Sequence, residues 1–169
     1  INVSFGRSAR DESASDIRNL RGAEWGGGLP VAGGEALLAG FYLNELLMKL
    51  LARHDPHAAL FDAYAQTLPS LVSTEDATVE AALRAFELRL LKEIGLLPEL
   101  SQVTLTQQPV QAARRYTLLA EAGVAAPTAG ELDVPGDALI MLQAALEHGS
   151  LAALQQACAF EQLQHAVQR

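Results

Sequence analysis

The sequence contains a single cysteine, Cys158, among its 169 residues. One cysteine cannot form a disulfide within the chain or supply a zinc site built from several cysteines. Because such sparse use of cysteine is typical of a reducing compartment, we expect a cytoplasmic location. No apolar run approaches the roughly 20 residues of a membrane-spanning helix, and the chain shows no signal peptide pattern. We therefore expect no contact with a membrane.

Positive charge and aromatic side chains are also scarce. Twelve Lys and Arg residues stand against 20 Asp and Glu residues, giving a net charge of −8, and aromatic residues make up 5%. Each contact with a phosphate group requires a cation, so a chain this acidic is poorly suited to general phosphate binding. One basic cluster stands apart near the start, formed by Arg7, Arg10, Arg18 and Arg21.

Apolar residues are abundant, at 50% of the chain, and Ala and Leu dominate among them. This composition favours a mainly α fold in which helices pack on helices. The apolar spacing predicts a first helix over 35–53, a third from 74–76 to Gly95, and a fourth that ends at Gly149. The second helix is expected to bend or end near Pro69 and is marked by Leu60, Phe61, Tyr64, Leu68 and Leu71. Ser150 is expected to cap a fifth helix. The helix over 35–53 is apolar nearly all round, which predicts a place at the centre of the bundle.

The chain is expected to comprise three parts. Residues 1–24 contain two short strand patterns, which cannot form a stable sheet alone. Residues 25–34 are rich in glycine and predict a linker without the motifs of a phosphate-binding loop. Residues 35–169 form the helical domain. Within it, 99–135 is the least regular stretch, with a short strand in R-R-Y-T-L-L and a loop in G-V-A-A-P-T-A-G-E-L.

Two charges interrupt the apolar surface of the helix that ends at Gly95. Glu87 falls inside its apolar stripe, and Arg84 lies just beside it. Since a charge among core contacts is costly unless it is paired, we expect Glu45, Arg84 and Glu87 to form an ion-pair cluster between helices. Breaking the Glu45–Arg84 pair should then be strongly destabilising. An arginine rimmed by apolar residues also suits a partner that carries a carboxylate and an apolar side chain. The candidate walls of a pocket for that apolar side chain, beside Arg84, are Leu88, Leu91 and Ile94.

The H-D-P-H stretch at 54–57 offers two histidines and an aspartate in a turn. A metal-dependent hydrolase could use such a group, but the stretch also suits a structural turn between helices, with Pro56 at a first helical turn. No catalytic triad, carboxylate pair or cofactor fingerprint is present in the sequence. We therefore expect a protein that is not an enzyme and needs no metal or cofactor. A purely structural helical adaptor is the further alternative.

Three blocks of the sequence resemble the RecO family of bacterial recombination mediators. They are G-F-Y-L-N-E-L-L-M-K-L-L at 40–51, D-P-H-A-A-L-F-D-A-Y at 55–64, and A-L-R-A-F-E-L-R-L-L-K-E-I-G at 82–95. The order and spacing of the blocks fit the family, as does the strand-like F-G-R-S…I-R-N-L-R-G-A-E-W ahead of them. The resemblance covers roughly residues 2–100.

The resemblance implies an N-terminal OB-fold barrel followed by a helical domain, with a role in DNA repair and recombination. Residues 1–24 would be the last strands of that barrel, and the four arginines named above its DNA-binding residues. Implied partners are single- and double-stranded DNA, RecR, and the C-terminal tail of single-stranded-DNA-binding protein at Arg84. Assistance with RecA loading is implied as well. Two features set the chain apart from the family pattern. The four cysteines of a zinc site that some members carry after the third helix are missing, and residues 151–169 are nearly neutral where the family is usually basic.

Overall fold

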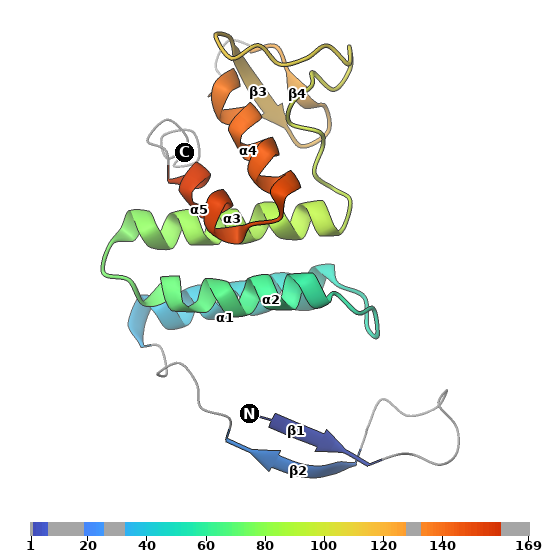
Figure 1. Ribbon diagram of the computed structural model, residues 1–169, viewed down its shortest axis with the longest axis vertical. Coiled ribbons are helices and arrows are strands. Elements are labelled where there is room, and N and C mark those ends of the chain that lie inside the picture. Colours follow the sequence, from blue (N-terminus) through green and yellow to red (C-terminus); the bar gives the residue numbers. More distant parts are fainter. Residues whose placement is uncertain (1, 7–18, 26–32, 128–132, 160–169) are drawn as a thin grey trace. The chain divides into compact units, whose positions relative to one another are not determined.

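The computed structural model describes residues 2–6, 19–25, 33–127 and 133–159 (Figure 1). The chain divides into two compact units, Ile1–Ala32 and Gly33–Arg169. The first unit contains the antiparallel strands β1 (Asn2–Phe5) and β2 (Leu20–Glu24), in which Asn2 pairs with Glu24 and Val3 with Ala23. Both strand patterns predicted in this region are therefore present. Their apolar side chains are about half exposed, at 51% for Val3.

The second unit is mainly helical, as the composition predicts. Its described residues form α1 (Gly34–Leu50), α2 (Ala58–Thr67), the 3₁₀ helix η1 (Leu68–Val72), α3 (Asp76–Glu93), α4 (Gly136–His148) and α5 (Leu151–Cys158). Glycines in the left-handed region follow α3 and α4, with φ of 74° at Gly95 and 69° at Gly149. Ser150 caps α5 through its hydroxyl, which accepts a hydrogen bond from the Ala153 amide at 3.3 Å.

The core of this unit is built around α3, which packs against α2, η1 and α5. Phe86 and Leu90 of α3 are almost completely buried, and the alanines at 81, 82 and 85 allow close approach of the neighbouring helices. Tyr64 of α2 meets the ring of Phe86 edge-on, with the ring centroids 6.2 Å apart. The centre of the bundle is therefore α3.

The prediction that the first helix lies at the centre is wrong. Only Leu43 of α1 is buried, whereas Leu38, Phe41 and Met48 are 65%, 58% and 84% exposed. Because α2, η1 and α5 already occupy most of the surface of α3, α1 can bury only one narrow side. An all-round apolar helix thus keeps a solvent-facing apolar surface in this unit.

Residues 99–135 contain a small antiparallel sheet in the order β4-β3-β5. Its strands are β3 (Arg115–Leu119), β4 (Gly123–Ala125) and β5 (Val134–Pro135). The strand predicted in R-R-Y-T-L-L is confirmed. The loop predicted over 123–125 is instead β4, because Val124 is fully buried and exchanges hydrogen bonds with Thr104: its amide donates to Thr104 Oγ1, and its carbonyl accepts from the Thr104 amide, both at 2.9 Å.

Candidate functional site

Arg84 lines a pocket of about 620 Å³ between the first half of α1, η1 and the first half of α3. Its apolar lining comes from Ala36 of α1, from Leu71 and Val72 of η1, and from Val79 and Leu83 of α3, and Tyr42 of α1 also lines it. The Arg84 side chain is 39% exposed, so the guanidinium is within reach of solvent while its stem packs on the helix. A fixed cation therefore lies beside an apolar cavity.

A hydrogen-bonded chain joins α1 to this arginine. The Tyr42 hydroxyl donates to Glu87 Oε1 at 2.7 Å, and Arg84 Nη1 donates to Glu87 Oε2 at 2.7 Å. Burial, and then the hydrogen bond to Glu87, raise the pKa of Tyr42 to about 12, so the hydroxyl remains a donor at neutral pH. Burial opposes the charge of Arg84, but the hydrogen bond to Glu87 and the charges of Glu87 and Glu80 leave the pKa of Arg84 raised.

The guanidinium of Arg84 is only partly satisfied by these contacts. Its Nε is buried and has no hydrogen-bond partner among the described residues. A guanidinium carries five N–H donors in a planar fork that matches a carboxylate, and a buried donor without a partner is costly. Arg84 therefore has a buried donor that Glu87 does not satisfy, and the exposed 39% of its side chain is the part that can meet an anionic ligand.

The ion-pair cluster predicted from the sequence is half right. Arg84 and Glu87 do pair, but the predicted contact between Glu45 and Arg84 is wrong. The Glu45 side chain is 58% exposed and pairs with Lys49, four residues along α1, at 2.5 Å. The hydrogen bond and charge of Lys49 lower the pKa of the Glu45 carboxyl. Because the Glu45–Lys49 pair is exposed to solvent, the large loss of stability predicted for breaking a buried Glu45–Arg84 pair does not follow.

The walls of the pocket also differ from the prediction. Leu88, Leu91 and Ile94 do not line it, and Leu88 and Ile94 pack against the core instead. Side chains on a helix lean toward its N-terminus, so Arg84 covers the turn that precedes it rather than the turn that follows. The apolar partners of Arg84 on its own helix are therefore Val79 and Leu83.

Acidic side chains also border the pocket. Besides Glu87, its lining includes Glu35, Asp76 and Glu80. Arg84 is the single basic residue among the lining residues. The site can therefore hold a carboxylate only where that group reaches the arginine, and the surrounding acids oppose any further negative charge placed along the walls.

The remaining predicted residues are not among those that line this pocket. Arg21 is exposed on β2, whereas Arg7, Arg10 and Arg18 lie outside the described residues. His57 lies 3.3 Å from Asp55 and from Glu93, but across the residues that the structure describes no cluster of three or more His, Cys, Asp or Glu side chains is placed to hold a metal ion. The turn thus shows a histidine held between two carboxylates.

Cys158 is buried, as expected for a small core residue, and burial raises the pKa of its thiol to about 12. A thiol with so high a pKa is a poor nucleophile at neutral pH. Within the described ranges, none of the helices combines the length and apolarity needed to cross a membrane.

An arginine beside an apolar cavity has the chemistry to hold a carboxylate and an apolar group together. The sequence matches the family model described as recombination protein O C terminal over residues 32–165, which is most of the chain. The chain therefore belongs to the RecO family.

Curated relatives support this assignment. A protein named DNA repair protein RecO from Polaromonas naphthalenivorans is 55% identical over 124 residues, covering 73% of this chain and 47% of the relative. The proteins of the same name from Verminephrobacter eiseniae and Variovorax paradoxus are 52% and 51% identical, each covering 79% of this chain and 53% of the relative. The chain thus spans about half the length of the curated relatives it matches.

Proposed function

We propose that the chain is the helical part of a non-enzymatic recombination mediator in DNA repair. Its membership of the RecO family supports this role, since the curated relatives carry the name DNA repair protein. In this proposal the protein acts with RecR to help load RecA onto single-stranded DNA, and it reaches that DNA through single-stranded-DNA-binding protein. The helical domain then serves as a docking domain for a partner polypeptide.

The observation that carries the docking proposal is the partly unpaired guanidinium of Arg84 beside an apolar cavity. The proposed ligand is the C-terminal tail of single-stranded-DNA-binding protein, an acidic tail that ends in an apolar residue with a free carboxylate. The terminal carboxylate would pair with Arg84, and the apolar side chain would lie against Leu71, Val79 and Leu83. The acidic residues of the tail would extend away from Glu80 and its neighbours, toward solvent.

Arg84→Ala should weaken binding of a fluorescently labelled tail peptide by about 10–100-fold, because a charge-assisted hydrogen bond contributes about 1.5–3 kcal/mol. The measurement is a titration followed by fluorescence anisotropy, with the thermal unfolding of each variant recorded in parallel. Arg84→Lys should restore only part of the affinity, since an ammonium group lacks the planar fork of a guanidinium.

Two variants serve as controls for this titration. Arg89→Ala removes the same side chain from another face of α3 and should leave the affinity for the Arg84 pocket unchanged. Glu80→Gln removes a carboxylate that borders the pocket and should raise the affinity, because it relieves repulsion of the tail. Binding by a folded Arg84→Ala variant at wild-type strength would show that the tail docks elsewhere.

We propose that DNA contacts come from the basic cluster of the N-terminal unit, Arg7, Arg10, Arg18 and Arg21, rather than from the acidic remainder. Residues 1–169 should bind oligonucleotides weakly and with strong salt dependence, since about four phosphates at most can be neutralised. For a duplex, the logarithm of the binding constant should fall with the logarithm of the salt concentration with a slope no steeper than about −3.6, which is about −0.9 for each of four phosphates. Anisotropy titrations between 50 and 200 mM salt measure this slope. Tight binding that salt leaves unchanged would contradict the assignment.

A further inference from the structure

The Arg84 pocket contains more negative than positive charge. Among the described residues that line it, Arg84 is the one cation, and the acids are Glu35 of α1 and Asp76, Glu80 and Glu87 of α3. Within the described part of the chain, no hydrogen bond or ion pair is found for the side chains of Glu35, Asp76 and Glu80. A ligand that enters the pocket therefore meets a net negative charge as well as the guanidinium.

Three of these acids form a row with Arg84 along one face of α3. Asp76, Glu80, Arg84 and Glu87 follow one another at intervals of three or four residues, which is the spacing of neighbours on a helix surface. Glu80 lies about one turn before Arg84, and Glu87 lies about one turn after it. The charges of both acids act on the guanidinium. Arg84 is thus flanked by a carboxylate on each side along the helix.

Glu87 is fixed in place beside the guanidinium. One of its oxygens accepts a hydrogen bond from Arg84 Nη1 and the other accepts one from the Tyr42 hydroxyl of α1, both at 2.7 Å. The Glu87 side chain is only 20% exposed, so solvent screens its charge less than that of a surface carboxylate. Turning aside would break both hydrogen bonds. A ligand of Arg84 must therefore share the guanidinium with a fixed negative charge.

The repulsion from these acids grows with the charge that a ligand brings, because a Coulomb energy is proportional to each of the two charges. A terminal carboxylate carries one charge, and an apolar side chain next to it adds none. A phosphate monoester carries about −1.5 to −2 at pH 7. A DNA strand places further phosphates at intervals of about 3.4 Å along the duplex axis. The additional charges would lie near Glu80 and Asp76, where the pocket offers no second cation.

We infer that Glu87 and Glu80 act as a charge filter, which admits an isolated carboxylate to Arg84 and excludes phosphate groups, including those of DNA. The filter keeps the pocket free for a polypeptide partner when the protein works on DNA, where phosphates are the most abundant anions. This inference rests on the proposed function of the Arg84 pocket as a carboxylate site. It adds that Glu87 and Glu80 set the specificity of that site.

Two probes with the same apolar group can measure the filter on the intact chain. Phenylbutyrate ends in a carboxylate, whereas phenylpropyl phosphate ends in a phosphate monoester that carries close to two charges at about pH 7.5. Titrations at low salt, followed through the methyl resonances of Val79 and Leu83, give a dissociation constant for each probe. The wild-type chain should bind the phosphate at least about 10-fold more weakly than the carboxylate, although an arginine without acidic neighbours would favour the more highly charged group.

Glu87→Gln removes the charge of this side chain and keeps its size. It should strengthen binding of the phosphate by at least about 10-fold and binding of the carboxylate by less, because the phosphate carries the larger charge. Glu80→Gln should act in the same direction. Glu121→Gln is the matched control, since Glu121 is exposed and does not line the pocket. This variant changes the net charge of the chain equally and should leave the ratio of the two dissociation constants unchanged.

A wild-type chain that binds the phosphate as tightly as the carboxylate would overturn the inference, as would a folded Glu87→Gln variant with an unchanged preference. It is also overturned if an oligothymidylate shifts the Val79 and Leu83 signals of the wild-type chain, since DNA phosphates would then reach Arg84. The labelled tail peptide separates this failure from that of the proposed function. If the peptide does not bind while the probes still show the preference, the filter stands and only the proposed partner falls. If neither probe moves the methyl signals, Arg84 binds no anion and both proposals fall.

Discussion

Phe86→Ala is expected to lower the free energy of unfolding by about 3–5 kcal/mol, the usual cost of removing a fully buried phenylalanine. Phe86 is 0% exposed and lies in the middle of α3, with the ring of Tyr64 packed edge-on against it. Alanines at 82 and 85 leave the neighbouring helices little freedom to close the cavity. Because α3 carries Arg84, the substitution should also loosen the Arg84 pocket.

Denaturant unfolding followed by circular dichroism measures this loss, and Phe61→Ala is its matched control. Phe61 of α2 is 69% exposed, so the same change there should alter the free energy of unfolding by no more than about 0.5 kcal/mol. Equal effects at the two positions would mean that α3 is not the centre of the core.

The helices were predictable from the sequence because their signals are local. Pro69 ends α2 in a 3₁₀ turn, Gly95 and Gly149 adopt the left-handed conformation after α3 and α4, and Ser150 caps α5. The place of α1 was not predictable in the same way. The apolar residues of α1 show which side chains the helix could bury. Which of them are buried is decided by the packing of the other helices around α3, and that packing depends on residues distant in sequence.

The Arg84 pocket was predictable in part. A charge within an apolar stripe indicates a special position, and Arg84 does pair with Glu87 and line a cavity. Its other partners depend on directions in space. Tyr42, rather than Glu45, is the α1 residue that reaches Glu87, whereas Glu45 pairs with Lys49 on its own helix.

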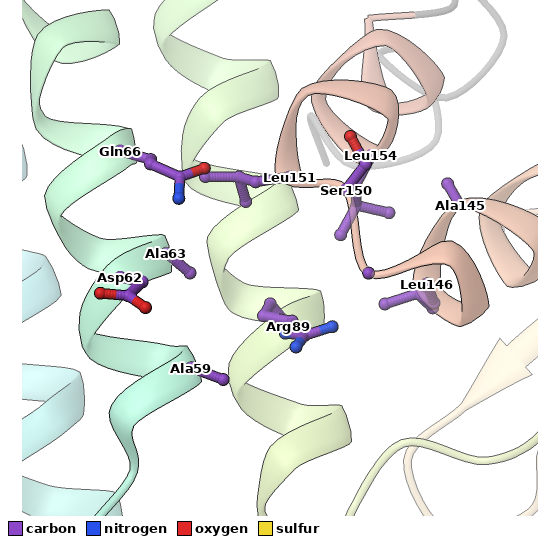
Figure 2. A pocket seen from close by; sticks show the side chains of 11 residues that line it. Ala59, Asp62, Ala63, Gln66, Arg89, Ala145, Leu146, Ser150, Leu151 and Leu154 are labelled. Carbon is purple, nitrogen blue, oxygen red and sulfur yellow. The ribbon is translucent and has the colours of Figure 1, made fainter.

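The cavity that Arg89 lines between α2 and the α4–α5 turn (Figure 2) gave no comparable signal in the sequence. Arg89 has the spacing of an ordinary solvent-facing residue on an amphipathic helix. Its cavity is assembled from Ala63 on α2 and from Leu146 and Leu151 at the α4–α5 turn, which lie far from it in the chain. Only the packed helices bring these residues together, so the pocket follows from tertiary structure alone.

The packing of residues 99–135 onto α4 provides the second large effect on stability. Gly136 begins α4, and its amide donates to the Arg114 carbonyl at 2.7 Å. A Cβ at this position would overlap the Gln111 carbonyl oxygen and lie 3.1 Å from the Arg114 oxygen, both of which belong to backbone. Backbone atoms cannot move aside as a flexible side chain does.

Gly136→Ala should therefore lower the free energy of unfolding by about 2–5 kcal/mol, combining about 1–3 for overpacking with about 1–2 for the disturbed hydrogen bond. Gly40→Ala is the control, because Gly40 lies within α1 and a Cβ there meets no atom within 4 Å. That change should stabilise the protein by about 0.5–1 kcal/mol, since alanine is the better helix former. Thermal and denaturant unfolding of the two variants should thus move in opposite directions, and a Gly136→Ala variant as stable as wild type would show that α4 tolerates displacement from Gln111.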